Sequence, residues 1–132
     1  MQSDLEAFIG IPFVDRGANY QGADCWGLAV LFYRDVLGIQ LPHQEYGPID
    51  DPAPGRDAAV NIEREQRRWD LITPGAEEFG DLVLMSCAGR WHIGVVVEFG
   101  RMLHVRRDID SVIERYDTPR WQPRLNGFYR YV

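Results

Sequence analysis

A chain of 132 residues, of which 45% are hydrophobic and 26% charged, has the length and composition of one globular domain, residues 1–132. Its net charge of −6 argues against the basic stripe of nucleic-acid-binding domains, so we expect no nucleic-acid partner. The one basic cluster, Arg64, Arg67 and Arg68, has the pattern of a solvent-exposed helix face.

The first residues predict a short helix and no targeting segment. Residues 1–6 lack the basic region and the apolar run of a signal peptide. Ser3 and Glu6 have the spacing of a capping box, which opens a helix that ends at Gly10. No apolar run is long enough to span a membrane. We therefore expect a protein that is made in the cytoplasm without a signal peptide and does not insert into membranes.

The rest of the first half predicts two helices between loops. A glycine-rich loop over residues 15–23 precedes Asp24, which can cap an amphipathic helix from about Cys25 to Leu37. The segment 41–55 contains four prolines and is predicted to be a surface loop. A second amphipathic helix, rich in Glu and Arg, is predicted over about 58–71.

The second half changes to short apolar and β-branched runs between turn residues, a pattern typical of strands. Gly100 and Arg101 form a tight turn between two of these runs, which are therefore predicted to pair as a hairpin. Helices followed by strands indicate an α+β domain, with helices on one face of an antiparallel sheet. Five strands are predicted, at residues 82–85, 92–99, 102–105, 111–116 and 127–132.

Cys25 is the candidate nucleophile, because it lies in the first turn of a predicted helix directly after a glycine-rich loop. The positive end of the helix dipole lowers the pKa of a thiol placed there, and the thiolate is the reactive form. The unpaired N–H groups of the first turn can also donate to an oxyanion. The alternative interpretation is an ordinary buried cysteine. Cys87 is expected to be a packing residue in the first predicted strand.

Two of the three histidines can serve as partners of a nucleophile. His43 lies in the proline-rich loop and is interpreted as a solvated loop residue. His92 and His104 lie on adjacent strands of the predicted hairpin, where two imidazoles can contact each other on one face. One ring could then fix the tautomer and orientation of the other, as the third member of a catalytic triad does.

Four segments, in order, resemble motifs of the NlpC/P60 family of cysteine peptidases. They cover about two thirds of the chain, and the ordered set is more specific than any one of them. The family motifs D-C-x-G-L, G-D-L-V and H-x-G-I/V, and the strand that carries the third catalytic residue, are matched by residues 24–28, 80–83, 92–95 and 102–105.

The resemblance implies a papain-like α+β fold and a thiol mechanism without cofactor or metal. In that mechanism Cys25 is the nucleophile, His92 the general base and His104 the residue that orients His92. The resemblance also implies the substrate class, the stem peptides of bacterial peptidoglycan, cut as a rule next to D-glutamate.

Other positions match the family's substrate-binding region, with two departures. Phe13 follows Pro12 where the family often has a tyrosine, and Tyr20 is the candidate source of the missing hydroxyl. Trp26 stands where many wall-turnover members have a serine, and Asp24 reads equally as the cap of the helix. We assign Asp24, Trp26, Phe13 and Tyr20 to substrate binding.

A tryptophan after the cysteine resembles members encoded by tailed bacteriophages and prophages. The implied partners are therefore phage tail-tip or baseplate proteins, and the implied location is a virion tail acting in the bacterial periplasm or cell wall. The proline-rich loop at 41–55 and the helix after it are the segments expected to contact those partners.

Three alternatives remain open at this point. The chain could be a mainly structural tail subunit with weak or no hydrolase activity. A metal site could form from Cys25, Cys87, His92 and His104, although structural zinc sites normally supply ligands in close pairs, which are absent here. The same thiol machinery could also carry out acyl transfer or deamidation, since both pass through a thioester.

Overall fold

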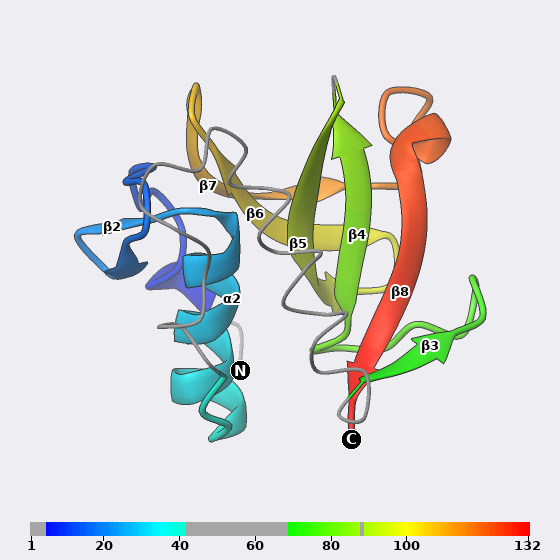
Figure 1. Cartoon of the computed structure of the whole chain (residues 1–132), viewed down its shortest axis with the longest axis horizontal. Coiled ribbons are helices and arrows are strands. Elements are labelled where there is room, and N and C mark those ends of the chain that lie inside the picture. The colour runs from blue at the N-terminus through cyan, green and yellow to red at the C-terminus, as the bar shows by residue number, and fades with distance from the viewer. Residues whose placement is uncertain (1–4, 42–68, 88) are drawn as a thin grey trace.

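The computed structural model describes residues 5–41, 69–87 and 89–132 and places the chain in an α+β arrangement (Figure 1). His43, the arginines at 64–68, and the predicted loop and helix between 42 and 68 lie outside the described residues. Among the described residues, no helix is long and apolar enough to cross a membrane. The fold class expected from the sequence is confirmed.

Six antiparallel strands form the main sheet, in the order β3-β8-β4-β5-β6-β7. The five predicted strands are all present, each within two residues of its predicted start. The strands are β3 (Trp69–Ile72), β4 (Leu82–Cys87), β5 (Arg90–Glu98), β6 (Arg101–Arg106), β7 (Ile109–Arg115) and β8 (Leu125–Tyr131), with a short 3-10 helix, η3 (Gln122–Arg124), before the last.

The sixth strand, β3, corrects the sequence prediction, because residues 69–71 of this strand lie at the end of the helix predicted over 58–71. Trp69 pairs with Tyr131 of β8, and their rings meet edge to face with centroids 5.2 Å apart. The partner is more than 60 positions away in the sequence. Tertiary pairing of this kind overrides a local helical pattern.

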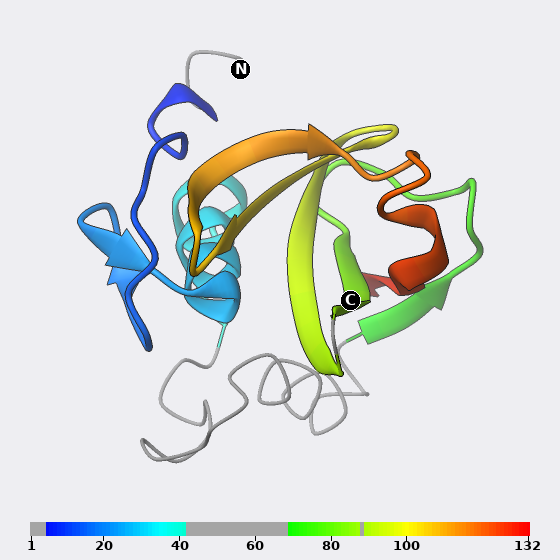
Figure 2. The same ribbon diagram turned by 90° about the horizontal axis from the view of Figure 1, so that it is seen from above.

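Within the described ranges, the helix that covers the sheet is α2 (Cys25–Phe32), which continues as a π-helical turn, η1 (Tyr33–Leu37). Gly38 ends it with φ at 70°, as the sequence predicts for a left-handed stop. All eight residues of α2 are buried, because the helix packs between β5 and β6 on one side and the N-terminal segment on the other (Figures 1 and 2).

Alternate residues of the strands divide the core into two clusters. In β4, Leu82 and Leu84 face α2, whereas Val83 and Met85 face the opposite side. The second cluster is covered by the chain around Trp121, which is 1% exposed. Both faces of the sheet are therefore packed over part of their area.

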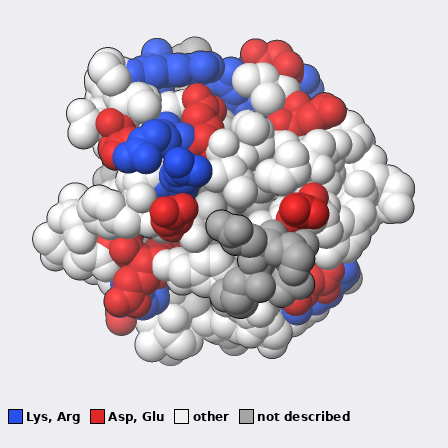
Figure 3. All heavy atoms as spheres, turned by 180° about the vertical axis from the view of Figure 1, so that it is seen from behind, with Lys and Arg blue, Asp and Glu red and all other residues white. Residues whose placement is uncertain are grey.

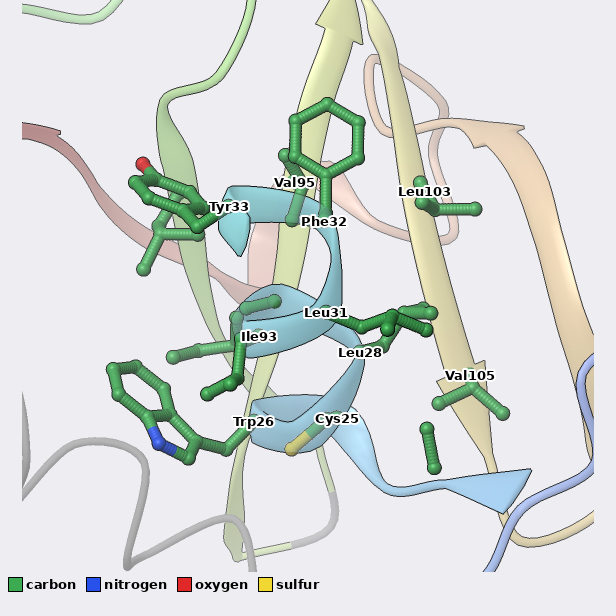
Figure 4. Packing of buried hydrophobic residues seen from close by; sticks show 14 of the residues in the cluster. Cys25, Trp26, Leu28, Leu31, Phe32, Tyr33, Ile93, Val95, Leu103 and Val105 are labelled. Carbon is green, nitrogen blue, oxygen red and sulfur yellow. The ribbon is translucent and has the colours of Figure 1, made fainter. Parts of the chain in front are cut away.

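The ladder between β5 and β6 is short. The pairing runs from Glu98 and Arg101 to Val95 and Leu103 and ends there among the described residues. Beyond that point β5 stays paired with β4, and β6 stays paired with β7, so the two strands separate. Figure 4 shows the first turn of α2 lying over this separation.

The N-terminal segment holds the start of α2. Residues 15–23, predicted as a loop, contain a small hairpin of β1 (Ala18–Asn19) and β2 (Gly22–Ala23). The hairpin approaches the helix so closely that a Cβ atom added to Gly27 would lie 1.7 Å from the carbonyl oxygen of Gly17. Glycine at position 27 is therefore a packing requirement, since any side chain would push the hairpin away from the helix.

We predict that Gly27→Ala strongly destabilises the protein, because the obstacle is backbone rather than a movable side chain. Urea denaturation followed by tryptophan fluorescence measures the effect. Gly38→Ala is the matched control: its Cβ meets open space, and the cost is the roughly 1–2 kcal/mol of a left-handed alanine. Equal losses in the two variants would contradict this reading of the contact between the hairpin and α2.

Candidate functional site

Cys25 lies at the start of α2, as predicted. Asp24 caps the helix: its Oδ1 accepts a hydrogen bond of 2.8 Å from the Gly27 N–H, and its Oδ2 accepts another from the Arg16 N–H. This double anchoring fixes the first turn of α2 against the N-terminal hairpin. The side chain of Cys25 lies near Ile93 of β5 and Val105 of β6, where these strands separate (Figure 4).

The electrostatic environment of Cys25 differs from the expectation. Burial raises the pKa of this thiol to about 12, and the negative charge of Asp24 adds to the effect. The backbone N–H groups of Ile93, Trp26 and Cys25 oppose the shift but do not reverse it. The predicted lowering by the helix dipole is therefore outweighed by desolvation, which favours the neutral thiol of Cys25.

His92 and His104 contact each other as predicted. The Nε2 atom of His92 and the Nδ1 atom of His104 are 2.8 Å apart, and both residues are buried. The chain of contacts continues beyond them: His104 Nε2 lies 2.9 Å from Oε1 of Glu114. The second carboxylate oxygen of Glu114 accepts a 2.9 Å hydrogen bond from the indole N–H of Trp121.

The directions of the pKa shifts indicate which of these hydrogen-bonded side chains are charged. Partial burial disfavours the charged form of Glu114, but hydrogen bonds from Trp121 and His104 outweigh it and lower the pKa of the carboxyl group. Burial lowers the pKa of His104 despite the opposing effect of Glu114. Burial, and then repulsion from Arg106 and from any positive charge on His104, lower the pKa of His92 well below its usual range. These directions favour a series of side chains made of a carboxylate, Glu114, and two neutral imidazoles, His104 and His92.

The tautomers follow from this assignment. Since the Glu114 carboxylate can only accept, His104 donates from Nε2 and is left with an acceptor at Nδ1. His92 must then donate from Nε2 to His104. The Nδ1 atom of His92 therefore carries a lone pair and is the basic atom of the pair.

Glu114 and Trp121 were missed by the sequence analysis. Glu114 lies opposite Met102 in the ladder between β6 and β7, two positions from the residue opposite His104. Trp121 stacks on His92 at a centroid distance of 6.1 Å and meets His104 edge to face at 5.4 Å. The available signal was a glutamate on the next strand, diagonally across from a histidine. That position depends on a strand register that the sequence does not specify.

A pocket of about 230 Å³ brings several of the predicted site residues together. Cys25, His92 and Phe13 line it. Cys87 also lines it, so this half-buried thiol, predicted to be a packing residue, borders the site as well as packing against the second core cluster. The remaining lining residues are Arg90, Trp91, Val105, Arg106, Arg107 and Asp108.

The other predicted substrate-binding residues lie outside the pocket lining. Asp24 and Trp26 have no exposed surface and serve the cap and the core, respectively. The Tyr20 hydroxyl donates a 2.6 Å hydrogen bond to Asp35, so it is directed to the surface of η1. Of the four residues assigned to substrate binding, Phe13 alone lines the pocket. Within the described ranges, no three His, Cys, Asp or Glu residues are arranged to hold a metal ion.

Comparison with known proteins gives one family. The NlpC/P60 family model matches residues 10–130. The chain is 24% identical over 132 residues to the gamma-DL-glutamyl hydrolase of Bacillus subtilis (strain 168), covering 97% of the chain and 28% of that relative. It is 23% identical over 119 residues to the murein DD-endopeptidase MepS/murein LD-carboxypeptidase of Escherichia coli (strain K12), covering 89% and 54%. The chain thus spans about half the length of these relatives or less.

Solved structures share the fold. An NlpC/P60 family protein from Bacillus cereus ATCC 10987 has a TM-score of 0.68 at 23% identity, covering 94% of this chain and 36% of the other. RipD from Mycobacterium tuberculosis, described as a non-catalytic NlpC/p60 domain protein adapted to peptidoglycan binding, has a TM-score of 0.62 at 17% identity, covering 97% and 91%. At these identities the likeness concerns the fold alone.

The neutral histidine pair predicts a loss of stability in mild acid. Because the pKa values of His92 and His104 are lowered by folding, the unfolded chain takes up more protons below pH about 6.5, and stability falls with falling pH. His92, whose pKa is lowered well below its usual range, should contribute about 1 kcal/mol of loss between pH 6.5 and 5.5, and His104 adds a loss in the same direction. Urea denaturation at both pH values measures it.

The control for this prediction is His92→Gln, whose side chain does not titrate. Its free energy of unfolding should depend less on pH over the same interval, whatever its value at pH 7. A wild-type protein whose stability is flat or rises between pH 6.5 and 5.5 would show that the pair is protonated in the folded state.

Proposed function

The chain belongs to the NlpC/P60 family, and we propose that it is a peptidoglycan hydrolase that cleaves amide bonds in stem peptides with Cys25 as the nucleophile. The observation that carries the proposal is the pocket in which Cys25 and His92 meet, with His92 held by His104 and Glu114. The activities for which two relatives are named, gamma-DL-glutamyl hydrolase and murein DD-endopeptidase, support the reaction class and the polymer.

The first half of the proposed reaction transfers one proton and forms one bond. As Cys25 attacks the amide carbon, the thiol proton passes to Nδ1 of His92, which the hydrogen-bond chain leaves unprotonated. Thiol and imidazole are both neutral at rest, so the proton moves during the attack. The N–H groups of Cys25 and Trp26, which lie close to the sulfur, are placed to donate to the oxyanion.

The second half returns the enzyme to its starting state. The imidazolium of His92 gives its proton to the leaving nitrogen, the C–N bond breaks, and a thioester remains on Cys25. Nδ1 of His92 then takes a proton from water, and the oxygen of this water attacks the thioester. The C–S bond breaks, and the sulfur of Cys25 takes the proton back from His92. While His92 is positively charged, the carboxylate of Glu114 stabilises it through His104.

We propose two finer points from the sequence motifs. The bond cut lies next to D-glutamate, and the protein reaches the wall as part of a phage tail tip or baseplate, as the tryptophan after Cys25 suggests. If so, the protein co-purifies with tail components when particles are isolated on a density gradient. Its recovery only as a free enzyme that is active on peptides unrelated to the wall would refute the tail assignment.

A binding role without catalysis is the second candidate. Cys25 is 6% exposed, and its pKa is raised rather than lowered. The non-catalytic RipD shares the fold. In this alternative the pocket holds stem peptides, or the domain serves as a mainly structural tail subunit, and no bond is cut.

We predict that Cys25→Ala abolishes the release of new peptide ends from purified peptidoglycan, as identified by mass spectrometry, and leaves the fold intact. Cys87→Ser is the matched control, a second thiol in the same pocket, and should keep most of the activity. If activity survives in Cys25→Ala, the proposal that Cys25 is the nucleophile is wrong. An inactive wild type that still sediments with peptidoglycan would favour the binding role.

The hydrogen-bond chain predicts a graded series of losses. His92→Gln removes the base and should lower kcat by about 10²–10⁴. His104→Gln keeps an acceptor for His92 and should retain measurable activity. Glu114→Gln no longer fixes the tautomers, because an amide can donate as well as accept, and should cost at least about tenfold in kcat with little change in KM. Equal losses in all three folded variants would contradict this division of roles.

A further inference from the structure

The positive charge of the chain is unevenly placed. All 14 cationic residues are arginines, and the net charge is −6. Three of the arginines, Arg90, Arg106 and Arg107, line the pocket of Cys25, with Asp108 as the one acidic lining residue. In Figure 3 most of the basic side chains on the visible face lie in its upper half. The pocket is thus basic in an acidic protein.

Three of the arginines outside the pocket have close carboxylate partners. The nearest nitrogen–oxygen distances are 2.7 Å from Arg34 to Asp35, 2.6 Å from Arg115 to Asp117, and 2.9 Å from Arg130 to Asp81.

The arginines that line the pocket lack carboxylate partners at such short distances. Arg106 reaches Asp108 at 3.5 Å, and that aspartate is 72% exposed. Arg90 and Arg107 have no carboxylate within 4.0 Å among the residues that the structure describes. Positive charge at the pocket is therefore left available to an anionic ligand.

Two of these guanidinium groups are held by aromatic rings. The guanidinium carbon of Arg106 lies 5.5 Å from the centre of the Trp121 ring, and that of Arg107 lies 5.0 Å from the centre of the Phe13 ring. The Nε atom of Arg106 is buried without a hydrogen-bond partner among the described residues. An arginine fixed in this way binds a planar, two-oxygen group at little entropic cost.

We propose that Arg106 and Arg107, assisted by Arg90, form a carboxylate-binding subsite beside Cys25, so that the protein acts on peptides with a free carboxylate close to the scissile amide and discriminates against the same peptides amidated at that position. The inference rests on the proposed function in naming a substrate; the anion subsite itself rests on the geometry of the pocket. The Arg106 that holds the carboxylate also lies close enough to His92 to lower the pKa of this imidazole. Burial is the main cause of the low pKa of His92, and the charge of Arg106 adds to it. A bound carboxylate offsets this added charge and so links binding to activation.

A pair of alkylating reagents tests the subsite without requiring hydrolysis. Iodoacetate carries a carboxylate and iodoacetamide a neutral amide of nearly the same size. The thiolate sulfur bonds to the CH₂ carbon of either reagent as iodide leaves, so a carboxymethyl or a carbamoylmethyl group is transferred. In a Cys87→Ser background the two rate constants report on Cys25. Arg106→Gln and Arg107→Gln should each lower the ratio of the iodoacetate to the iodoacetamide rate constant about tenfold, the value of a charge-assisted contact.

Two further variants complete the design. Arg34→Gln, on η1 and already paired with Asp35, is the matched charge control and should leave the ratio unchanged. Arg106→Lys keeps the charge without the planar fork and should fall between wild type and Arg106→Gln. If Arg106→Gln fails to fold, the exposed Arg107 carries the test. An unchanged ratio in folded Arg107→Gln and Arg106→Gln, or an equal fall in Arg34→Gln, would overturn the subsite.

Matched peptide substrates then connect the subsite to catalysis. The wild type should prefer the peptide with the free carboxylate over its carboxamide in kcat/KM, and Arg106→Gln should lose about tenfold of that preference. If no peptide is cut but the alkylation ratio depends on the arginines, the proposed function fails and the subsite stands. If peptides are cut without preference and the ratio is insensitive to the arginines, the subsite fails and the proposed function stands.

Discussion

The early end of the ladder between β5 and β6 is the constraint on which the rest of the site depends. Pairing stops at Val95 and Leu103, and past that point the two strands keep only their outer partners. His92 and His104 project from the separated ends toward the face opposite α2 and remain within hydrogen-bond distance of each other. The first turn of α2 lies over the same separation, so Cys25 from one face of the sheet and His92 from the other line the same pocket.

Burial then determines the charge state of the site. The same removal of water raises the pKa of Cys25 and lowers that of His92, so both partners are neutral. The anionic end of the hydrogen-bond chain, Glu114, is the better solvated end, and Arg120 lies 3.8 Å from it. The charges therefore lie at the margin of the site, where water screens them, and its centre becomes charged only when a proton moves.

What the sequence could reveal depended on the range of the interactions involved. The helix start at Cys25 and the strands that carry His92 and His104 follow from local spacing, and the structure contains them. Glu114 belongs to the site only through the register between β6 and β7, which residue patterns do not specify. The strand character of Trp69 depends on β8, far along the chain. The pKa of Cys25 depends on burial by the whole fold, which outweighs the local dipole.

The position of β8 has a consequence for how the molecule folds during synthesis. β8 follows all the other strands in the sequence, yet it lies inside the sheet, between β3 and β4. Until residues 125–131 have left the ribosome, β4 has an open hydrogen-bonding edge, and β3 has no neighbour in the sheet. Contacts of such long sequence separation form slowly, and an open edge made of Leu82 to Cys87 is a template for aggregation. A nascent chain paused before residue 125 is therefore a natural client for a chaperone that binds extended apolar segments.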